Sequence, residues 1–164
     1  MKRWLALTGL LVAIAPRVTL AAGEESTVTV IPAKTMAANF AKAAMIRETP
    51  LYKVHASHRE AAGVAEIHTR DTDVIYVVEG HATFVAGGHA VGAKTTASDE
   101  LRGARIEGGE RHTLAKGDVV IVPNGVPHWF EEVSGPFDYF VVKVTSPAAD
   151  AAAGVTPTSA GSER

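Results

Sequence analysis

The sequence predicts an all-β fold, and two features carry that prediction. Between residues 51 and 145, short runs rich in Val, Ile, Thr, Tyr and Phe alternate with turns made of Gly, Pro, Asn and Asp. Apolar residues at helical spacing are found before this region, near the N-terminus. Short strands that follow one another without intervening helices are typical of a β-barrel or a β-sandwich.

The predicted strands are bounded by turn residues on both sides. They cover residues 51–57, 63–68, 74–79, 82–86, 105–106, 111–114, 119–122, 128–133 and 137–145. The runs 74–78 and 119–122 are apolar on both alternating faces, which predicts that both faces are covered. An inner barrel sheet backed by a helix or by a second subunit would meet that requirement.

Two further segments differ from the strand pattern. Residues 32–45 are expected to form one short amphipathic helix that covers the sheet, because Met36, Phe40 and Ala44 recur at i, i+4 and i+8. Residues 87–109 mix glycines with charged residues and are expected to form an irregular loop. Such a loop could close over a barrel mouth and bring Glu100 or Glu107 as an extra ligand, or its charges could simply be solvated.

Composition limits the classes of function. A length of 164 residues with 46% hydrophobic residues suits one globular domain. The net charge of −2 gives no basis for nucleic-acid binding. The absence of cysteine excludes disulfides, thiolate catalysis, Cys-ligated zinc and iron–sulfur clusters. Stability must therefore come from packing.

Both ends of the chain are expected to lie outside the folded domain. Lys2 and Arg3, an apolar run over residues 4–15 and small residues at 21–23 resemble a secretory signal peptide. That run is shorter than the about 20 residues of a membrane span, and an uncleaved anchor is the alternative. The predicted organisation is a signal peptide at 1–23, an extension with the helix at 24–50, a barrel at 51–145 and a disordered tail at 146–164. The mature protein is expected to be periplasmic or secreted, without contact to a membrane.

The segment from Gly117 to His128 is the most informative motif. Gly117 opens a turn, residues 119–122 form a short apolar strand, and Pro123, Asn124 and Gly125 close it. His128 follows this turn directly, so its position is well defined, and we interpret it as a metal ligand. A buried histidine that only donates a hydrogen bond is the alternative interpretation.

A second polar cluster lies upstream and favours the metal-site interpretation. His68 ends one predicted strand and Asp73 begins the next, so both lie at the rim of one turn. With His128 they offer two imidazoles and one carboxylate, a set that suits one divalent transition metal: Fe, Mn, Ni, Co or Zn. The spacing favours Asp73 over Glu79 as the ligand, because six strand residues carry Glu79 roughly 20 Å away from Asp73, and Glu79 is expected to be a turn residue before Gly80.

These motifs resemble those of a small single-domain cupin. The second cupin motif, G-x5-P-x-G-x2-H-x3-N, is matched at Gly117, Pro123, Gly125 and His128, with Glu132 at the Asn position. The resemblance covers roughly residues 52–144 and implies a cupin-like β-barrel or jelly roll.

The first cupin motif, G-x5-H-x-H-x3,4-E-x6-G, is matched less closely. Aligned on His68, the motif puts Arg70 at the second His position. Counted back from Gly80, Asp73 stands at the Glu position, one residue closer to the His pair than usual. An arginine stays protonated and cannot ligate a metal. Arg70 is therefore expected to bind a substrate carboxylate, or to pair with Asp71 or with Asp73; pairing with Asp73 would leave the site without metal.

Among the other histidines, His58 shares an alternating face with Tyr52, Val54 and Ala56 and could point into the barrel, whereas His55 is expected to face outward. Two classes of function remain open. One is a metal-dependent enzyme that acts on a small organic, acidic substrate as an oxygenase, isomerase or lyase. The other is a non-catalytic cupin that binds a small ligand. A homodimer is expected in either case.

Overall fold

The computed structural model describes residues 28–146. The predicted signal peptide at 1–23, and the predicted tail after Ser146, lie outside the described residues and stay predictions. Within residues 28–146 no helix is long and apolar enough to cross a membrane.

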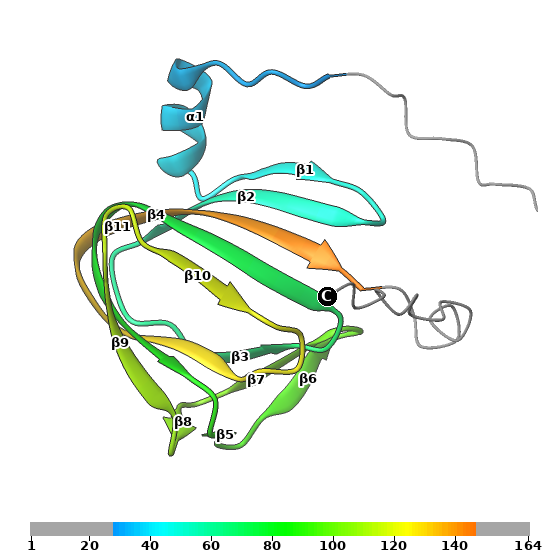
Figure 1. Cartoon of the computed structure of the whole chain (residues 1–164), viewed down its shortest axis with the longest axis vertical. Coiled ribbons are helices and arrows are strands. Elements are labelled where there is room, and N and C mark those ends of the chain that lie inside the picture. The colour runs from blue at the N-terminus through cyan, green and yellow to red at the C-terminus, as the bar shows by residue number, and fades with distance from the viewer. Residues whose placement is uncertain (1–27, 147–164) are drawn as a thin grey trace, which may run out of the picture. The chain divides into compact units, whose positions relative to one another are not determined.

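The described part of the chain is built almost entirely of strands, as the sequence predicts (Figure 1). Helix α1 (Ala33–Phe40) comes first. The strands that follow are β1 (Met45–Glu48), β2 (Tyr52–Arg59), β3 (Ala65–His68), β4 (Asp71–Ala86), β5 (His89–Ala90), β6 (Lys94–Ala97), β7 (Glu100–Gly103), β8 (Ile106–Glu107), β9 (Glu110–Ala115), β10 (Val119–Val122) and β11 (His128–Thr145).

One antiparallel sheet contains all of these strands except β5 and β8, which pair with each other. Its hydrogen-bonded order is β1-β2-β11-β3-β7-β6, and β4 joins it by pairing with β9, β10 and β11. Figure 1 shows this sheet curled on itself, with β3 and β7 facing the β4–β10 side. The result is the curled all-β sheet expected of a cupin-like barrel.

The curl arises in the ribbon formed by the two long strands, β4 and β11. They pair antiparallel from His128 opposite Ala86 to Thr145 opposite Asp71. The register shifts at several points along β11, and such bulges bend a strand and increase its twist. Gly80 lies opposite the largest interruption and has a φ of 88°. Both ends of the ribbon therefore turn toward the same side of the domain.

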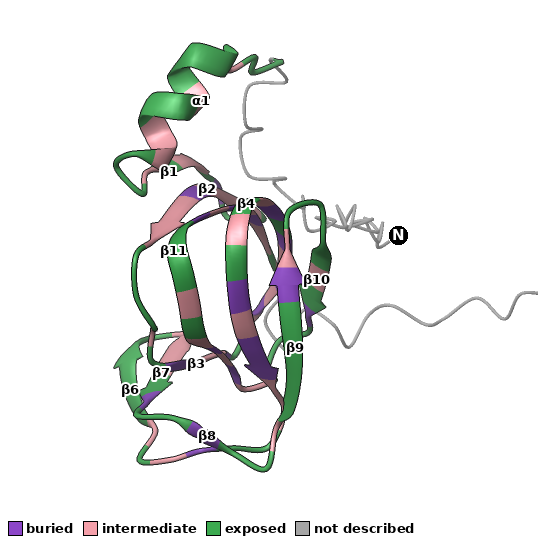
Figure 2. Cartoon of the chain, turned by 90° about the vertical axis from the view of Figure 1, so that its left-hand side faces the viewer, coloured by how far each residue is buried: buried purple, intermediate pink, exposed green. Residues whose placement is uncertain are grey.

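The apolar core fills the bend of this ribbon. Figure 2 shows buried residues alternating with more exposed ones along β4. The Phe130 ring lies 5.0 Å from the Phe84 ring, 5.0 Å from the Tyr139 ring and 5.4 Å from the Phe137 ring, between centroids. Aromatic contacts at such distances add to the hydrophobic gain of burial. Packing thus supplies the stability that a cysteine-free chain needs.

The helix is shorter than the apolar spacing indicates, so its predicted end was wrong. It stops at Phe40, the chain turns through Ala43 at a φ of 48°, and Met45 begins β1. Strand β1 pairs with β2, which the sequence did not predict. The hydrogen bonds of β1 with β2 outweigh the helical propensity of the apolar spacing, which continues to Ala44.

The prediction of an irregular loop at 87–109 was also wrong. This segment contains β5, β6, β7 and β8, and β7 pairs with β3 over its whole length. Every residue of β6 is exposed, so the strand lacks the apolar alternation by which strands are predicted. Strand β6 forms by backbone pairing with β7, which local sequence does not reveal.

The outer face of β10 is not covered by any of residues 28–146. Val119 and Ile121 are 59% and 64% exposed, and Tyr76, opposite Val119, is 47% exposed. The expectation that the helix covers this face was therefore wrong for the described residues. The alternative, a second subunit on this face, stays a prediction.

An added methyl group at Gly80, as at Gly88, would meet backbone atoms and should destabilise the domain. A Cβ there would lie 2.3 Å from the backbone oxygen of Pro136, at a φ that disfavours any L side chain. We expect Gly80→Ala to lower the free energy of unfolding by about 3 kcal/mol or more, the sum of left-handed strain and overpacking. Denaturant unfolding measures the change.

Gly117→Ala is the matched control. Gly117 has a φ of 95° but no atom within 4 Å of the added Cβ, so only the strain of about 1–2 kcal/mol applies. Equal losses in the two variants would show that the close approach at Pro136 does not matter.

Candidate metal centre

Three strand ends deliver the sequence-predicted ligands to one place. His68 is the last residue of β3, Asp73 lies at the start of β4, and His128 is the first residue of β11. The turn before β11 is tied to the turn after β3, because the Gly125 amide donates to the His68 carbonyl oxygen at 2.8 Å. Asn124 Nδ2 donates to the Thr69 carbonyl oxygen at 3.2 Å. These two bonds hold His128 next to His68.

The three side chains meet around one carboxylate oxygen. Asp73 Oδ2 lies 3.5 Å from His68 Nε2 and 3.9 Å from His128 Nε2. The imidazole centroids are 5.1 Å apart. All three side chains are deeply buried, with 5%, 6% and 4% of Asp73, His68 and His128 exposed. The structure thus brings together the three residues that the sequence proposed as ligands.

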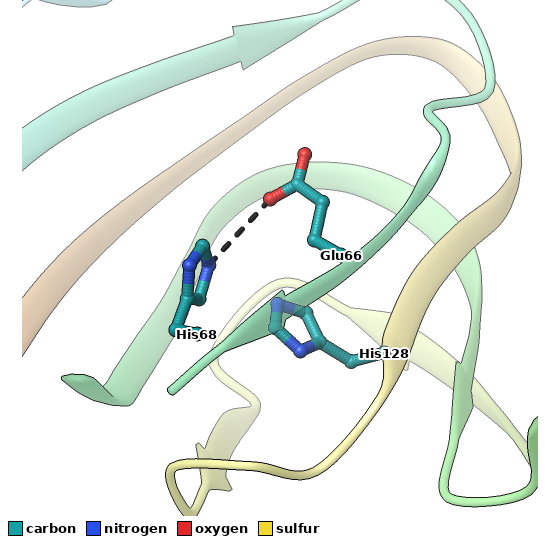
Figure 3. Close-up of side chains that lie close together, drawn as sticks. All are labelled: Glu66, His68 and His128. Carbon is teal, nitrogen blue, oxygen red and sulfur yellow. Dashed lines mark ion pairs between the residues drawn. The ribbon is translucent and has the colours of Figure 1, made fainter. Parts of the chain in front are cut away.

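Glu66 joins this cluster and was not among the predicted ligands. It lies on β3, two residues before His68, and so on the same face of the strand. Figure 3 shows its carboxylate beside the two imidazoles, with Oε2 3.6 Å from His68 Nε2. Glu66, His68 and His128 each present a ligand atom within 4.8 Å of one another, a group that could hold a metal ion.

A different alignment of the first cupin motif would have found Glu66. With Glu66 and His68 at the two histidine positions, Asp73 follows after four residues and Gly80 after six more, as H-x-H-x3,4-E-x6-G requires. Of the spacings in the motif, only that between the opening glycine and the first histidine position then differs from G-x5-H. Glu66 replaces an imidazole in this alignment, and Arg70 no longer falls at a ligand position.

Each imidazole offers a nitrogen suited to a metal. His128 Nδ1 lies 3.1 Å from the Val126 carbonyl oxygen, which only accepts, so Nδ1 carries the proton and Nε2 keeps its lone pair. His68 Nε2 is buried and has no hydrogen-bond partner among residues 28–146. An unsatisfied buried polar atom costs about 1–3 kcal/mol, which a bound ion would remove.

Burial lowers the pKa of His68, and the nearby Lys143 ammonium lowers it further. His55 has its pKa lowered by the same two causes in the same order. Both imidazoles are therefore neutral at pH 7, as metal ligation and proton acceptance require.

Lys143 is the main partner of Asp73. Its Nζ lies 2.8 Å from Oδ1 and 2.7 Å from Oδ2 of that carboxylate. The pair follows from strand register, because Lys143 on β11 stands directly opposite Asp73 on β4. Asp73 is thus neutralised by a lysine and not by Arg70.

Arg70 lies apart from the cluster. Its guanidinium donates to the Ser146 carbonyl oxygen at 2.9 Å and lies 3.9 Å from Asp99 Oδ2. It is not among the residues that line either cavity beside the cluster. The predicted substrate-binding role therefore gains no support from its position.

Two arginines that the sequence did not single out lie beside Glu66. Arg59 Nη2 and Arg102 Nη2 are 3.7 Å and 3.8 Å from Glu66 Oε1. Arg59 also lies over the Phe130 ring at 4.8 Å and donates from Nε to the Tyr139 hydroxyl at 3.1 Å. These contacts fix its planar guanidinium in the wall of the barrel.

Two cavities flank the cluster. One, of about 190 Å³, is lined by Asp73, His128, Glu66 and both arginines. The other, of about 230 Å³, is lined by His68, Asp71 and Glu100. His55 and Lys143 line both cavities. These volumes are below the ~300–1,000 Å³ of pockets for drug-sized ligands, so they fit a small molecule.

The expected directions of His55 and His58 are reversed. His55 lines both cavities, whereas His58 pairs with Asp138 at 2.6 Å, away from the cluster. Lys53, Ser57 and Arg59 alternate with His55 on the cavity side. The barrel interior is polar at this strand, so the apolar face of β2 is the outer one. The assumption that the apolar face points inward therefore gave the wrong directions for the two histidines.

The donor types and spacing of the cluster could hold a metal ion. Two atoms that each lie about 2.1 Å from one ion are at most about 4.2 Å apart, and the distances from Asp73 Oδ2 to both imidazoles satisfy this limit. Imidazole and carboxylate donors suit Fe, Mn, Co, Ni or Zn. The residues present therefore fit a metal.

A family model described as Cupin matches residues 52–161. The chain belongs to the cupin family. The family predicted from the two motifs is thereby confirmed. Cupins bind small-molecule ligands or substrates, and they commonly bind a metal. A search of curated proteins returned no match.

Several solved structures are similar to part of this chain at low sequence identity. A protein of Klebsiella pneumoniae with a double-stranded β-helix domain is 18% identical, over 64% of this chain and 72% of that one, at a TM-score of 0.45. A cupin of Bacteroides fragilis is 12% identical, over 71% and 81%, at 0.42. A DMSP lyase of Ruegeria pomeroyi is 18% identical, over 58% and 39%, at 0.41.

The stability of the metal-free protein should fall as the pH is lowered. His68 has a folded pKa below the 6.5 of the unfolded chain, so the unfolded state binds more protons. Its contribution is complete above pH 6.5 and is lost as the pH falls through 6.5 toward the folded pKa. We expect His68→Gln to flatten this pH dependence of the unfolding free energy, measured in denaturant between pH 5 and 8.

His58→Gln is the matched control, because its effect has the opposite sign. The hydrogen bond with Asp138 raises the pKa of His58, so its contribution is complete below pH 6.5 and is lost as the pH rises through the folded pKa. Removing it should steepen the loss toward acid pH. A flatter profile in both variants would contradict the assignment.

Proposed function

We propose that this protein is a metal-dependent cupin that acts on a small organic acid. The observation that carries the proposal is the meeting of two buried imidazoles with Glu66 and Asp73 between two small cavities. His68 and His128 would hold the ion through Nε2, with Glu66 or Asp73 as the anionic ligand. A bound divalent metal supplies Lewis-acid or redox chemistry at positions that the protein leaves open.

The remaining residues suit an acidic substrate. Arg59 is held rigid by Phe130 and Tyr139, so little freedom is lost when its guanidinium binds a carboxylate. Arg102 is 46% exposed and lines the same cavity. Together they take the role that the sequence analysis gave to Arg70. His55, neutral at pH 7 and lining both cavities, is placed to accept a proton from a bound substrate.

One observation favours a second candidate, a cupin that binds a small ligand without metal or turnover. Asp73 is already paired with Lys143, and Glu66 lies near Arg59 and Arg102. The charges of the site are thus compensated by the protein's own side chains. The metal affinity of the purified protein distinguishes the two candidates.

Metal binding should require both imidazoles. We expect His68→Ala and His128→Ala to weaken binding by well over 100-fold, because loss of a ligand exceeds the roughly 10–100-fold effect of changes around the ligands. Calorimetric titration of the metal-free protein with Fe(II), Mn(II), Co(II), Ni(II) and Zn(II) measures the affinity.

His112→Ala is the matched control for these variants. Its imidazole is 45% exposed on β9, so the affinity should not change. Wild type that binds none of the five metals would overturn the enzyme proposal and leave the ligand-binding candidate. Equal loss in all three variants would show that the titration does not report on this site.

We also propose that the protein is exported. Support comes from the basic start, the apolar run and the small residues over positions 1–23. The mature chain should begin between Ala22 and Glu24, and mass spectrometry of protein from the native host measures its mass. A dominant species that retains Met1 would contradict export by cleavage.

A further inference from the structure

One carboxylate oxygen of the cluster has two competing partners. Asp73 Oδ2 lies 3.5 Å from His68 Nε2 and 3.9 Å from His128 Nε2, and Lys143 Nζ contacts the same oxygen at 2.7 Å. Lys143 holds the other oxygen of Asp73 at 2.8 Å. The Lys143 ammonium is therefore bound to one of the two carboxylates that could ligate a cation between the histidines.

The competition is strong because the pair is buried. Asp73 is 5% exposed and Lys143 17%, so water screens the attraction only weakly. A divalent ion on Asp73 Oδ2 would stand close to the ammonium and would be repelled by it. Lys143 has space to withdraw, since its side chain lines both cavities.

The same arrangement affects metals unequally. With Asp73 held by Lys143, and Glu66 within 4 Å of two guanidinium groups, the donors that remain unopposed are the two imidazoles. Imidazole binds Zn(II) and Ni(II) well, whereas Mn(II) depends more on carboxylate oxygens. The pairing of Lys143 with Asp73 thus weakens the binding of Mn(II) more than that of Zn(II) or Ni(II).

We propose that Lys143 is the residue that sets metal selectivity at this site, by competing with the bound ion for Asp73. The inference rests on the proposed metal-binding function and deepens it. Lys143 acts through Asp73, and is thus a positioning residue that favours Zn(II) and Ni(II) over Mn(II).

Titration of metal-free protein with Mn(II) and with Zn(II) tests this role. We expect Lys143→Met to tighten Mn(II) binding at least 10-fold and Zn(II) binding by a smaller factor, so that the ratio of the two dissociation constants falls. Asp73→Asn/Lys143→Met removes the carboxylate as well and should lose the gain in Mn(II) affinity. Should Lys143→Met not fold without metal, Lys143→Gln, which keeps a hydrogen-bond donor for Asp73, serves in its place with the same expected direction.

Lys53→Met is the matched control. Lys53 forms a similar pair, with Asp71 at 2.9 Å, but neither residue belongs to the ligand cluster. Its removal should leave both metal affinities within about twofold of wild type. A gain as large as that of Lys143→Met would overturn a specific role for Lys143.

The outcomes separate this inference from the function on which it rests. Metal binding by Lys143→Met but not by wild type supports the competition and overturns the metal-dependent function of the natural chain. Equal affinities in both, or weaker binding in Lys143→Met, overturn the competition and leave the function standing. No binding in either overturns both.

Discussion

The bend of the β4–β11 ribbon is the constraint on which the site depends. His128 and Lys143 are 15 positions apart on one strand, a stretch that in extended form would span roughly 50 Å. Yet His128 Nε2 and Lys143 Nζ lie 3.9 Å and 2.7 Å from the same oxygen of Asp73. Bulges in β11 and the glycine at position 80 permit this return. Without the bend, neither the ligand cluster nor its counter-charges would exist.

The bend also divides the interior into an apolar and a polar part. Aromatic rings around Phe130 fill the inside of the curl, while the other end contains buried imidazoles, carboxylates and cations. Burying a carboxylate is unfavourable unless it is paired. Asp73 has Lys143, and Glu66 has Arg59 and Arg102 nearby, so the domain tolerates a charged interior.

The sequence predicted the parts of this arrangement that depend on local signals. Turn residues before His128 and after His68 mark the strand ends that the fold brings together, and the cupin motifs identified the family. Glu66 was missed because the first motif was aligned two residues too late. Strands β4 and β11 were each predicted as two short strands, because turn residues and bulges near the middle of the ribbon interrupt the apolar alternation.

What the sequence could not supply is register between distant strands. Lys143 meets Asp73 because of the pairing of β11 with β4, and β7 lies beside β3 although its residues are polar. The inward direction of His55 follows from a polar barrel interior, which reverses the usual rule for the apolar face of a strand. These features depend on tertiary packing, which outweighs local propensity.

The most direct test of a metal centre at the end of this ribbon is anomalous X-ray diffraction from crystals of protein reconstituted with Zn(II). The account predicts one strong peak between His68 Nε2 and His128 Nε2, about 2.0–2.1 Å from each nitrogen. Crystals of fully reconstituted protein without a peak there, with Lys143 still on both oxygens of Asp73, would contradict it.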